Sequence, residues 1–308
     1  WDSLGADILR LWVASTDFRS EMVASDEILK RTSDQYRRIR NTFRFILGNL
    51  SDFNDKNKVE FNDQVELDKW IINETKVLQK EITALYESYS YHKATQKIHN
   101  FCVNELGGIY LDIVKDRLYT CKNDSLARRS CQTSLDFILN VLVRLIAPIL
   151  SYTAEEIWQT SDRLNHQEKS VFLSNFDTFE IELESSINQS EWKRIFEIKD
   201  AVNQSIEEMR NDNKLKGSLD SVVNIQATSN DFQILNKLGD ELHFLFISSE
   251  AKVKEGNTFK IKVTTSKNAK CVRCWHRDLS VGSIKEHPEL CNRCIDNIEN
   301  DGEQRKSV

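Results

Sequence analysis

The sequence predicts a mainly α protein, in which a helical bundle is followed by a small α+β module and a C-terminal knuckle built on four cysteines. Only two prolines occur in 308 residues, and up to about Asn211 apolar residues recur every three or four positions, as on the buried side of a helix. After Gly217 the apolar runs become short or alternate with polar residues, which is typical of strands. Two Cys-x-x-Cys pairs follow near the C-terminus.

The helical part divides at polar, turn-forming stretches, which fall at residues 51–60 and 120–125. Pro148 is expected to end or kink the helix before it, and Thr153 with Glu156 predicts a capping box for the next helix. The helices expected on this basis cover residues 33–50, 67–118, 126–147, 154–159 and 191–211.

The α+β module is expected to hold a small sheet. Short apolar runs bounded by Gly, Asn and Ser predict strands over 222–227, 242–247 and 259–263, with a helix near 232–238 packed on them. Residues 299–308 are charged enough to fray.

The cysteine spacing predicts a structural metal site. Cys271 and Cys274 form one pair and Cys291 and Cys294 the other, with sixteen residues between the pairs. Four thiolates fill a tetrahedral zinc shell and leave no open position for catalysis. Two disulfides are the alternative. Residues 252–294 carry ten Lys/Arg against four Asp/Glu and too few apolar residues to form a core, so we expect a bound metal ion to stabilise their fold. His276 and His287 are weaker ligand candidates, since four thiolates already complete the shell.

Overall charge argues against indiscriminate nucleic-acid binding, because the net charge is −6 and such binding needs a broadly positive surface. Local cationic groups are nevertheless present, and the alternative for each arginine is pairing with an acid of the protein. Trp275, next to a cysteine, either packs over the knuckle or offers a stacking face. The candidate polyanion contacts are Arg37, Arg40 and Arg44 on one helix face and Arg273, Trp275, Arg277 and Arg293 around the cysteines.

Cysteine usage and hydropathy predict a cytoplasmic, soluble protein. Cys102, Cys121 and Cys131 follow no pairing pattern and are expected as reduced core residues. The longest apolar run, residues 137–150, is interrupted by polar residues, so no membrane association is expected. Because the chain begins with Trp1 inside a helical pattern, we expect it to be a fragment whose N-terminal part is missing.

Several stretches of the chain together form one recognisable series, which runs LGADILRLWVASTD at 4–17, SDEILKR at 25–31, YRRIRNT at 36–42, YLDIVKDR at 110–117, ARRSCQT at 127–133, GDEL at 239–242 and the cysteine pairs. In this order, along essentially the whole chain, they resemble the C-terminal half of bacterial isoleucyl-tRNA synthetase, a class I aminoacyl-tRNA synthetase. Val272 stands where this family often has proline, and Asp220 where glutamate is usual. The two adenylate-forming signatures of the class, His-x-Gly-His and Lys-Met-Ser-Lys-Ser, are absent, as is the editing domain.

The resemblance implies a division of labour. The full enzyme would activate isoleucine with ATP and magnesium and charge tRNA(Ile), as a monomer, whereas this part would recognise the anticodon arm and be catalytically inactive by itself, with no catalytic residue in it. Arginine and tryptophan suit that task, because unpaired loop bases are read by stacking and edge contacts. The implied domains are the tail of the catalytic half at 1–24, a helical anticodon-binding bundle at 25–190, a connecting α+β module at 191–266 and a zinc-binding tail at 267–308.

Two other functions deserve comparison. A zinc finger of this spacing also ends the DNA glycosylases that excise oxidised bases, but those use an N-terminal proline amine and a strand-rich first domain, whereas this chain begins with Trp1 and is helical for some two hundred residues. The second is a stand-alone, zinc-stapled helical module that binds RNA or a protein. Upstream coding sequence would distinguish it from a synthetase fragment.

Overall fold

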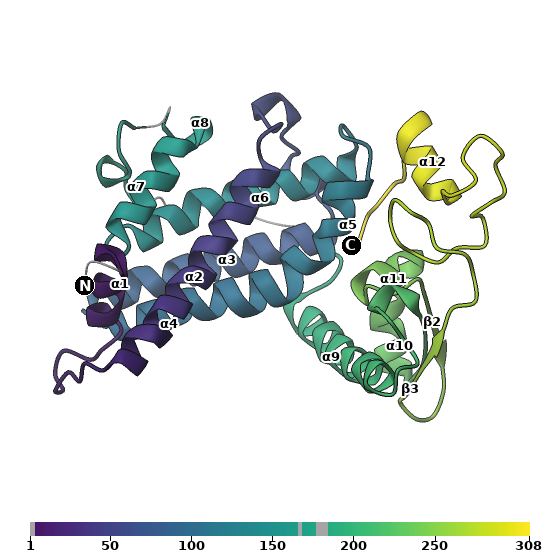
Figure 1. The fold of residues 1–308 in the computed structure, drawn as a ribbon, viewed down its shortest axis with the longest axis horizontal. Coiled ribbons are helices and arrows are strands. Elements are labelled where there is room, and N and C mark those ends of the chain that lie inside the picture. Colours follow the sequence, from purple (N-terminus) through teal and green to yellow (C-terminus); the bar gives the residue numbers. More distant parts are fainter. Residues whose placement is uncertain (1–3, 166–167, 177–183) are drawn as a thin grey trace. The chain divides into compact units, whose positions relative to one another are not determined.

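The computed structural model describes residues 4–165, 168–176 and 184–308, and it confirms a mainly α chain with one small sheet (Figure 1). The chain forms two compact units. The first comprises residues 1–58, 71–112 and 132–182, and the second residues 59–70, 113–131 and 183–308. No helix among the described residues is long and apolar enough to cross a membrane. The four linear domains remain a prediction, because the helices Glu66–Glu87, Leu111–Thr120 and Leu126–Ile146 each contribute residues to both units.

The first unit is a helical bundle. Helix α2 shows why it forms: the Ser25 hydroxyl accepts the Ile28 N–H at 3.2 Å and caps the helix, and Ile39, Phe43 and Ile46 form its buried stripe. This matches the helix expected at 33–50. The helices with all or part of their length in this unit are α1 (Ala6–Ala14), α2 (Asp26–Asn49), the 3-10 helix η1 (Asp55–Asn57), α3 (Glu66–Glu87), α4 (Tyr91–Phe101), the π-helix η3 (Cys102–Tyr110), α5 (Leu111–Thr120), α6 (Leu126–Ile146), α7 (Ser151–Thr160), α8 (Asp162–Asn165) and the 3-10 helix η4 (Val171–Leu173).

The uninterrupted helical stretch predicted for 67–118 is wrong at one point, between α3 and α4. Tyr89 adopts a positive φ of 54°, its N–H donates to the Tyr86 carbonyl, and the Ser90 N–H donates to the Leu85 carbonyl at 2.8 Å. These two bonds end a helix in the manner usually supplied by glycine. Because a tyrosine takes the glycine position, the sequence carries no visible stop signal there.

The capping box predicted at Thr153 does not form, because α7 begins earlier, at Ser151. A carboxylate from α1 caps this helix instead. Asp7, which is buried, accepts the backbone N–H of Tyr152 at 3.2 Å and the N–H and hydroxyl of Thr153 at 2.6 Å each. A negative charge at a helix N-terminus is favourable, and its partner here lies 145 positions away in sequence.

The second unit holds the sheet. Its strands follow the order β2-β1-β3, with β1 parallel to β2 and antiparallel to β3. Asn188 and Glu191 form a true capping box at the start of α9, whose Trp192 and Phe196 pack with Trp70. The elements of this unit include α5 (Leu111–Thr120), α9 (Gln189–Asn211), β1 (Ser221–Ala227), α10 (Ser229–Asn236), α11 (Leu242–Leu245), β2 (Glu250–Glu255), β3 (Lys260–Thr265) and α12 (Asn292–Glu299).

One predicted strand is wrong. Residues 242–247 form the short helix α11 and a turn, since Leu242, Phe244 and Leu245 are all buried on a helical turn and not on one face of a sheet. The third strand is β2 (Glu250–Glu255), which the sequence analysis missed. Its lysines and glutamates hide the strand pattern, because only Ala251 and Val253 are apolar.

Candidate metal centre and the charged contacts around it

The four cysteines converge from two short segments of the second unit. Cys271 and Cys274 lie on a tight turn after β3, in which the Cys271 N–H donates to the His276 carbonyl at 2.9 Å and the Trp275 N–H donates to the Cys271 carbonyl at 3.0 Å. Trp275 closes this turn with a φ of 65°. Cys291 is the N-cap residue of α12 and Cys294 lies in its first turn.

The geometry of the sulfur atoms fits one tetrahedral ion. All four sulfurs lie within 4.8 Å of one another, and those of Cys274 and Cys291 are 3.7 Å apart. A tetrahedral zinc with Zn–S bonds of about 2.3 Å places its sulfurs about 3.8 Å apart. All seven cysteines of the chain are free, so the disulfide alternative is not realised. The four cysteines are buried and form a closed zinc knuckle.

The surroundings of Cys294 lower the pKa of its thiol and so favour the thiolate. Hydrogen bonds from the thiols of Cys274 and Cys291, together with one from Arg273, lower the pKa of Cys294 to about 4, against the opposing effect of burial. The thiolate is the form that binds metal. His276 is not among the clustered ligands: its buried ring packs edge-on to His243, with centroids 5.8 Å apart, and its Nδ1 lies 4.0 Å from Asp116.

Arg273 lies against the cysteine cluster. Its guanidinium donates to the Cys294 sulfur at 3.7 Å and to the Thr120 carbonyl at the end of α5. Both contacts are partly buried. The side chain predicted to bind a polyanion therefore supports a metal ligand in this structure.

Arg277 is held by the small sheet. Its guanidinium donates to Asp220 at 2.6 Å and to the Asn268 carbonyl at 3.0 Å, and its backbone N–H donates to the Ser249 hydroxyl at 2.6 Å. Asp220 is the position at which the chain carries aspartate in place of the glutamate usual in the family. Aspartate keeps the carboxylate, and its bond to Arg277 joins the knuckle to the residue that directly precedes β1.

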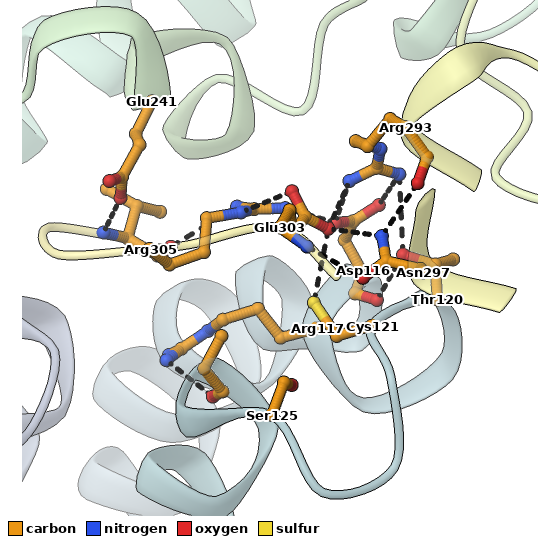
Figure 2. A network of polar contacts seen from close by, with 12 residues as sticks. Asp116, Arg117, Thr120, Cys121, Ser125, Glu241, Arg293, Asn297, Glu303 and Arg305 are labelled. Carbon is orange, nitrogen blue, oxygen red and sulfur yellow. Dashed lines mark hydrogen bonds and ion pairs between the residues drawn. The ribbon is translucent and has the colours of Figure 1, made fainter. Parts of the chain in front are cut away.

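Arg293 belongs to a buried charge network, which Figure 2 shows from close by. Asp116 of α5 accepts from Arg293 at 2.7 and 2.8 Å and from Arg305 at 2.7 Å, and Glu303 accepts from Arg293 at 3.2 Å and from Arg305 at 2.9 Å. Both guanidinium groups also lie over the Phe244 ring. The network joins α5, α12 and the C-terminal segment within the second unit.

This network fixes the charge state of its carboxylates. Burial raises the pKa of Asp116, but the positive charges of Arg293 and Arg305 outweigh it, so the pKa lies far below its usual value. The pKa of Glu303 is lowered in the same way, against the opposing effect of burial. Both groups are ionised at neutral pH, and each guanidinium has its counter-charge.

The fraying predicted for 299–308 is wrong for the last residues. Glu241 accepts the backbone N–H groups of Lys306, Ser307 and Val308 at 2.7 to 2.9 Å. The carbonyls of Lys306 and Ser307 in turn accept the N–H groups at the start of α3, at 3.0 Å each. Arg305 is 1% exposed. Two of the charges that suggested fraying, Glu303 and Arg305, form internal ion pairs.

Trp275 is the tail candidate that faces solvent. Its side chain is 61% exposed, so it does not shield the knuckle. The Lys270 ammonium lies 5.6 Å from the centre of its ring, which is within cation–π range. The pair presents a flat aromatic surface with a positive charge beside it.

The three bundle candidates share one side of α2, at i, i+3 and i+7. Arg37 makes an exposed ion pair with Asp34 at 2.7 Å, and Arg40 makes one with Glu156 at 2.8 Å. Arg44 is exposed and has no ion-pair partner in the described part of the chain. The acid-pairing alternative thus applies to Arg37 and Arg40, though only at the surface.

Comparison with known proteins gives the family. A model described as the anticodon-binding domain of tRNA ligase matches residues 68–225. The chain belongs to this family. A second model, described as a zinc finger found in FPG and IleRS, matches residues 269–297, which include all four cysteines.

Curated relatives are isoleucine–tRNA ligases, as the resemblance implies. Those of Teredinibacter turnerae and Idiomarina loihiensis are each 45% identical over 99% of this chain, and that of Pseudoalteromonas atlantica is 46% identical over 99%. In each case the match covers 34% of the relative. The chain therefore spans about a third of the length of the curated relatives it matches.

Proposed function

We propose that this chain is the anticodon-arm-binding part of an isoleucine–tRNA ligase and that its nucleic-acid partner is tRNA(Ile). The observation that carries the proposal is the 45% identity to isoleucine–tRNA ligases along 99% of the chain, together with the anticodon-binding match at 68–225. Activation of isoleucine with ATP and magnesium, and transfer to tRNA, belong to the larger part of the relatives that this chain does not match. The chain acts as a monomer in the cytoplasm.

The metal in this proposal is one structural zinc ion, held by Cys271, Cys274, Cys291 and Cys294. Buried sulfurs within 4.8 Å of one another support this assignment. A closed thiolate shell has no site for water or substrate, so the ion stabilises the knuckle and takes no part in catalysis. Its role is to fix the turn that presents Trp275.

The RNA contacts divide by accessibility. Trp275 with Lys270 offers a face on which an unpaired anticodon-loop base can stack, and Arg37 and Arg44 offer exposed guanidinium groups for phosphates. Arg40 can reach RNA if it leaves its exposed pair with Glu156. Arg273, Arg277 and Arg293 are bound by carbonyl, sulfur and carboxylate groups of the protein, which supports a role in holding the knuckle in place.

A footprint of the zinc-loaded chain on total tRNA tests the function. Enrichment of isoleucine acceptors with protection of their anticodon loops is the expected result. Binding to all tRNAs alike would favour the stand-alone RNA-binding module. No binding to tRNA above that of an unrelated acidic protein would refute the proposal.

Replacement of the exposed tryptophan makes the test sharper. Trp275→Ala removes the stacking face and is expected to weaken binding to the tRNA(Ile) anticodon stem-loop by about 1–3 kcal/mol, the usual contribution of one base–aromatic stack. Val272→Ala is the matched control, because Val272 is 55% exposed on the same turn. Equal affinity of the two variants in a fluorescence titration would remove Trp275 from the contact.

A further inference from the structure

The open face of the small sheet carries four lysines in two rows. Lys252 and Lys254 lie on β2, and Lys260 and Lys262 on β3, on either side of the central strand β1. The register places Asn224 between Lys252 and Lys262, and Gln226 between Lys254 and Lys260. Neighbours in register point to the same side of a sheet, so the six side chains share one face.

This face is the one that the helices leave uncovered. In β1 the residues at 221, 223, 225 and 227 are buried, whereas those at 222, 224 and 226 are half-buried. All four lysines are exposed, and the residues that alternate with them on β2 and β3 are half-buried against the helices. In Figure 1 the labelled helices α10 and α11 lie on one side of the sheet, in agreement with this pattern.

The charge of the face is mostly unneutralised. Lys252 pairs with Glu250 on the same strand. Lys254, Lys260 and Lys262 have no acidic partner within residues 4–165, 168–176 and 184–308. With Asn224, Gln226 and Thr264 the lysines line a hollow of about 860 Å³, whose lining also includes one acidic residue, Asp240. In a chain of net charge −6, this is a concentrated positive surface.

The side chains indicate which partner fits. Protein interfaces are enriched in aromatic residues and arginine and depleted in lysine, which is the opposite of this face. Phosphate groups accept hydrogen bonds from lysine and from asparagine or glutamine amides alike. None of the nine residues in register on this face is aromatic, so it offers no platform for base stacking, unlike the sheets that read RNA sequence through aromatic side chains.

We infer that the lysine face of the β2-β1-β3 sheet is a second RNA contact, which binds the phosphate backbone of the tRNA without reading its sequence. The inference rests on the proposed function, because it assumes that tRNA is the partner. It adds a site that the sequence analysis did not name, since there the charge of residues 252–262 was counted with the zinc tail. Trp275 supplies base contact, and the lysine face supplies affinity that depends on salt.

A different explanation of the lysines must be tested at the same time. β2 and β3 are the two edge strands, and exposed lysines on edge strands prevent sheets from pairing with other chains. That explanation predicts aggregation of a lysine-free variant and no change in its affinity for RNA. The two explanations therefore differ in a measurable quantity.

The test uses the full zinc-loaded chain with Lys254, Lys260 and Lys262 replaced by alanine. The control replaces Lys56, Lys80 and Lys193, which are exposed elsewhere and change the net charge equally. Binding to a tRNA(Ile) transcript is measured from 50 to 200 mM salt. Loss of three phosphate contacts should reduce the slope of log K against log salt by about 3, one for each contact, and weaken binding on the order of tenfold. The control should retain the wild-type slope.

The outcomes separate this site from the proposed function. If wild-type chain binds tRNA and the sheet variant matches the control in affinity and slope, the lysine face is not an RNA contact and the function stands. If wild-type chain itself does not bind tRNA, the function fails. If an acidic protein, and not RNA, loses affinity for the sheet variant, the partner class is wrong.

A measurement on the unmodified chain guards against misfolding of the variant. Amine-reactive labelling read by mass spectrometry should show Lys254, Lys260 and Lys262 protected severalfold by tRNA, with Lys56, Lys80 and Lys193 labelled as in free protein. Equal labelling of both sets in the presence of saturating tRNA would overturn the inference.

Discussion

The arginines of helix α2 and the arginines of the zinc knuckle carry the same charge in opposite surroundings. Arg37 is 72% exposed and meets one acid three residues away, whereas Arg293 is 18% exposed and meets two carboxylates, Glu303 ten positions away and Asp116 177 positions away. Exposed ion pairs contribute between 0 and 1 kcal/mol, because water screens them and the side chains lose freedom. Breaking a buried pair costs far more, because one charge remains without a partner.

Under the proposed function, positive charge in this sequence therefore serves two purposes, binding a partner and holding the fold together. On α2 the guanidinium groups remain accessible, so a phosphate can compete for them. In the knuckle they are already bonded to a thiol, a carbonyl or a carboxylate, and a phosphate would have to displace these groups at the expense of the fold. The following predictions test whether the two sets differ in this way.

The largest effect is expected from removal of a metal ligand. Cys291→Ser should lose the zinc ion, and since metal binding supplies on the order of 10 kcal/mol to the folding of zinc fingers, residues 271–294 should unfold. Hydrogen exchange should then be fast in the knuckle and unchanged in α2. Ser283→Ala, on the exposed part of the same loop, is the control and should keep its zinc. One equivalent of tightly bound zinc in Cys291→Ser would contradict the site.

A smaller but still large effect is expected from Asp116→Ala. Two mostly buried guanidinium groups then share the single carboxylate of Glu303, and the free energy of unfolding should fall by about 3–5 kcal/mol. Asp34→Ala removes the exposed partner of Arg37 and should cost less than about 1 kcal/mol. Urea unfolding of both variants measures the contrast. Equal losses would mean that burial does not distinguish the two sets of arginines.

Structure that depends on neighbouring residues can be predicted from this sequence, whereas contacts between residues far apart in the chain cannot. The Cys-x-x-Cys spacing predicts the knuckle, because the two halves of each pair lie within one turn. Asp116 could not be recognised as the centre of the network, because Arg293 and Arg305 lie 177 and 189 positions away. No local signal distinguishes Asp116, because the same helix also carries Asp112, Lys115 and Arg117.

Two other errors have the same cause. Tyr89 ends α3 in a backbone conformation that sequence rules associate with glycine. β2 is an edge strand whose exposed side is lysine, so its period-two pattern is weak, and its pairing with β1 stabilises it. In both cases contacts made in the folded chain override the local preference of the residues.

The pH dependence of stability should follow the buried network. The folded-state pKa of Asp116 lies below the ordinary aspartate pKa of 3.8, because Arg293 and Arg305 lie beside the carboxylate. Its stabilising effect is therefore complete above about pH 4 and is lost as the pH falls toward the folded-state pKa. Asp116→Asn should lose less stability than wild type between about pH 5 and pH 2, measured by urea unfolding. If the free energy of unfolding changes with pH equally in both proteins, Asp116 is not the group that causes the pH dependence.

The smallest effect on stability, and the one that separates the two sets most directly, is expected on α2. Arg37→Ala with Arg44→Ala should change the free energy of unfolding by less than about 0.5 kcal/mol, because both side chains are exposed. The salt slope of tRNA binding should nevertheless fall by about 2, one for each phosphate contact removed. Arg277→Ala should have the opposite effect. It leaves Asp220 without its ion-pair partner, so the free energy of unfolding should fall. The salt slope of tRNA binding by the protein that remains folded should stay unchanged. If instead Arg277→Ala lowered the slope and the α2 variant did not, the knuckle would hold the accessible guanidinium groups and the comparison would be reversed.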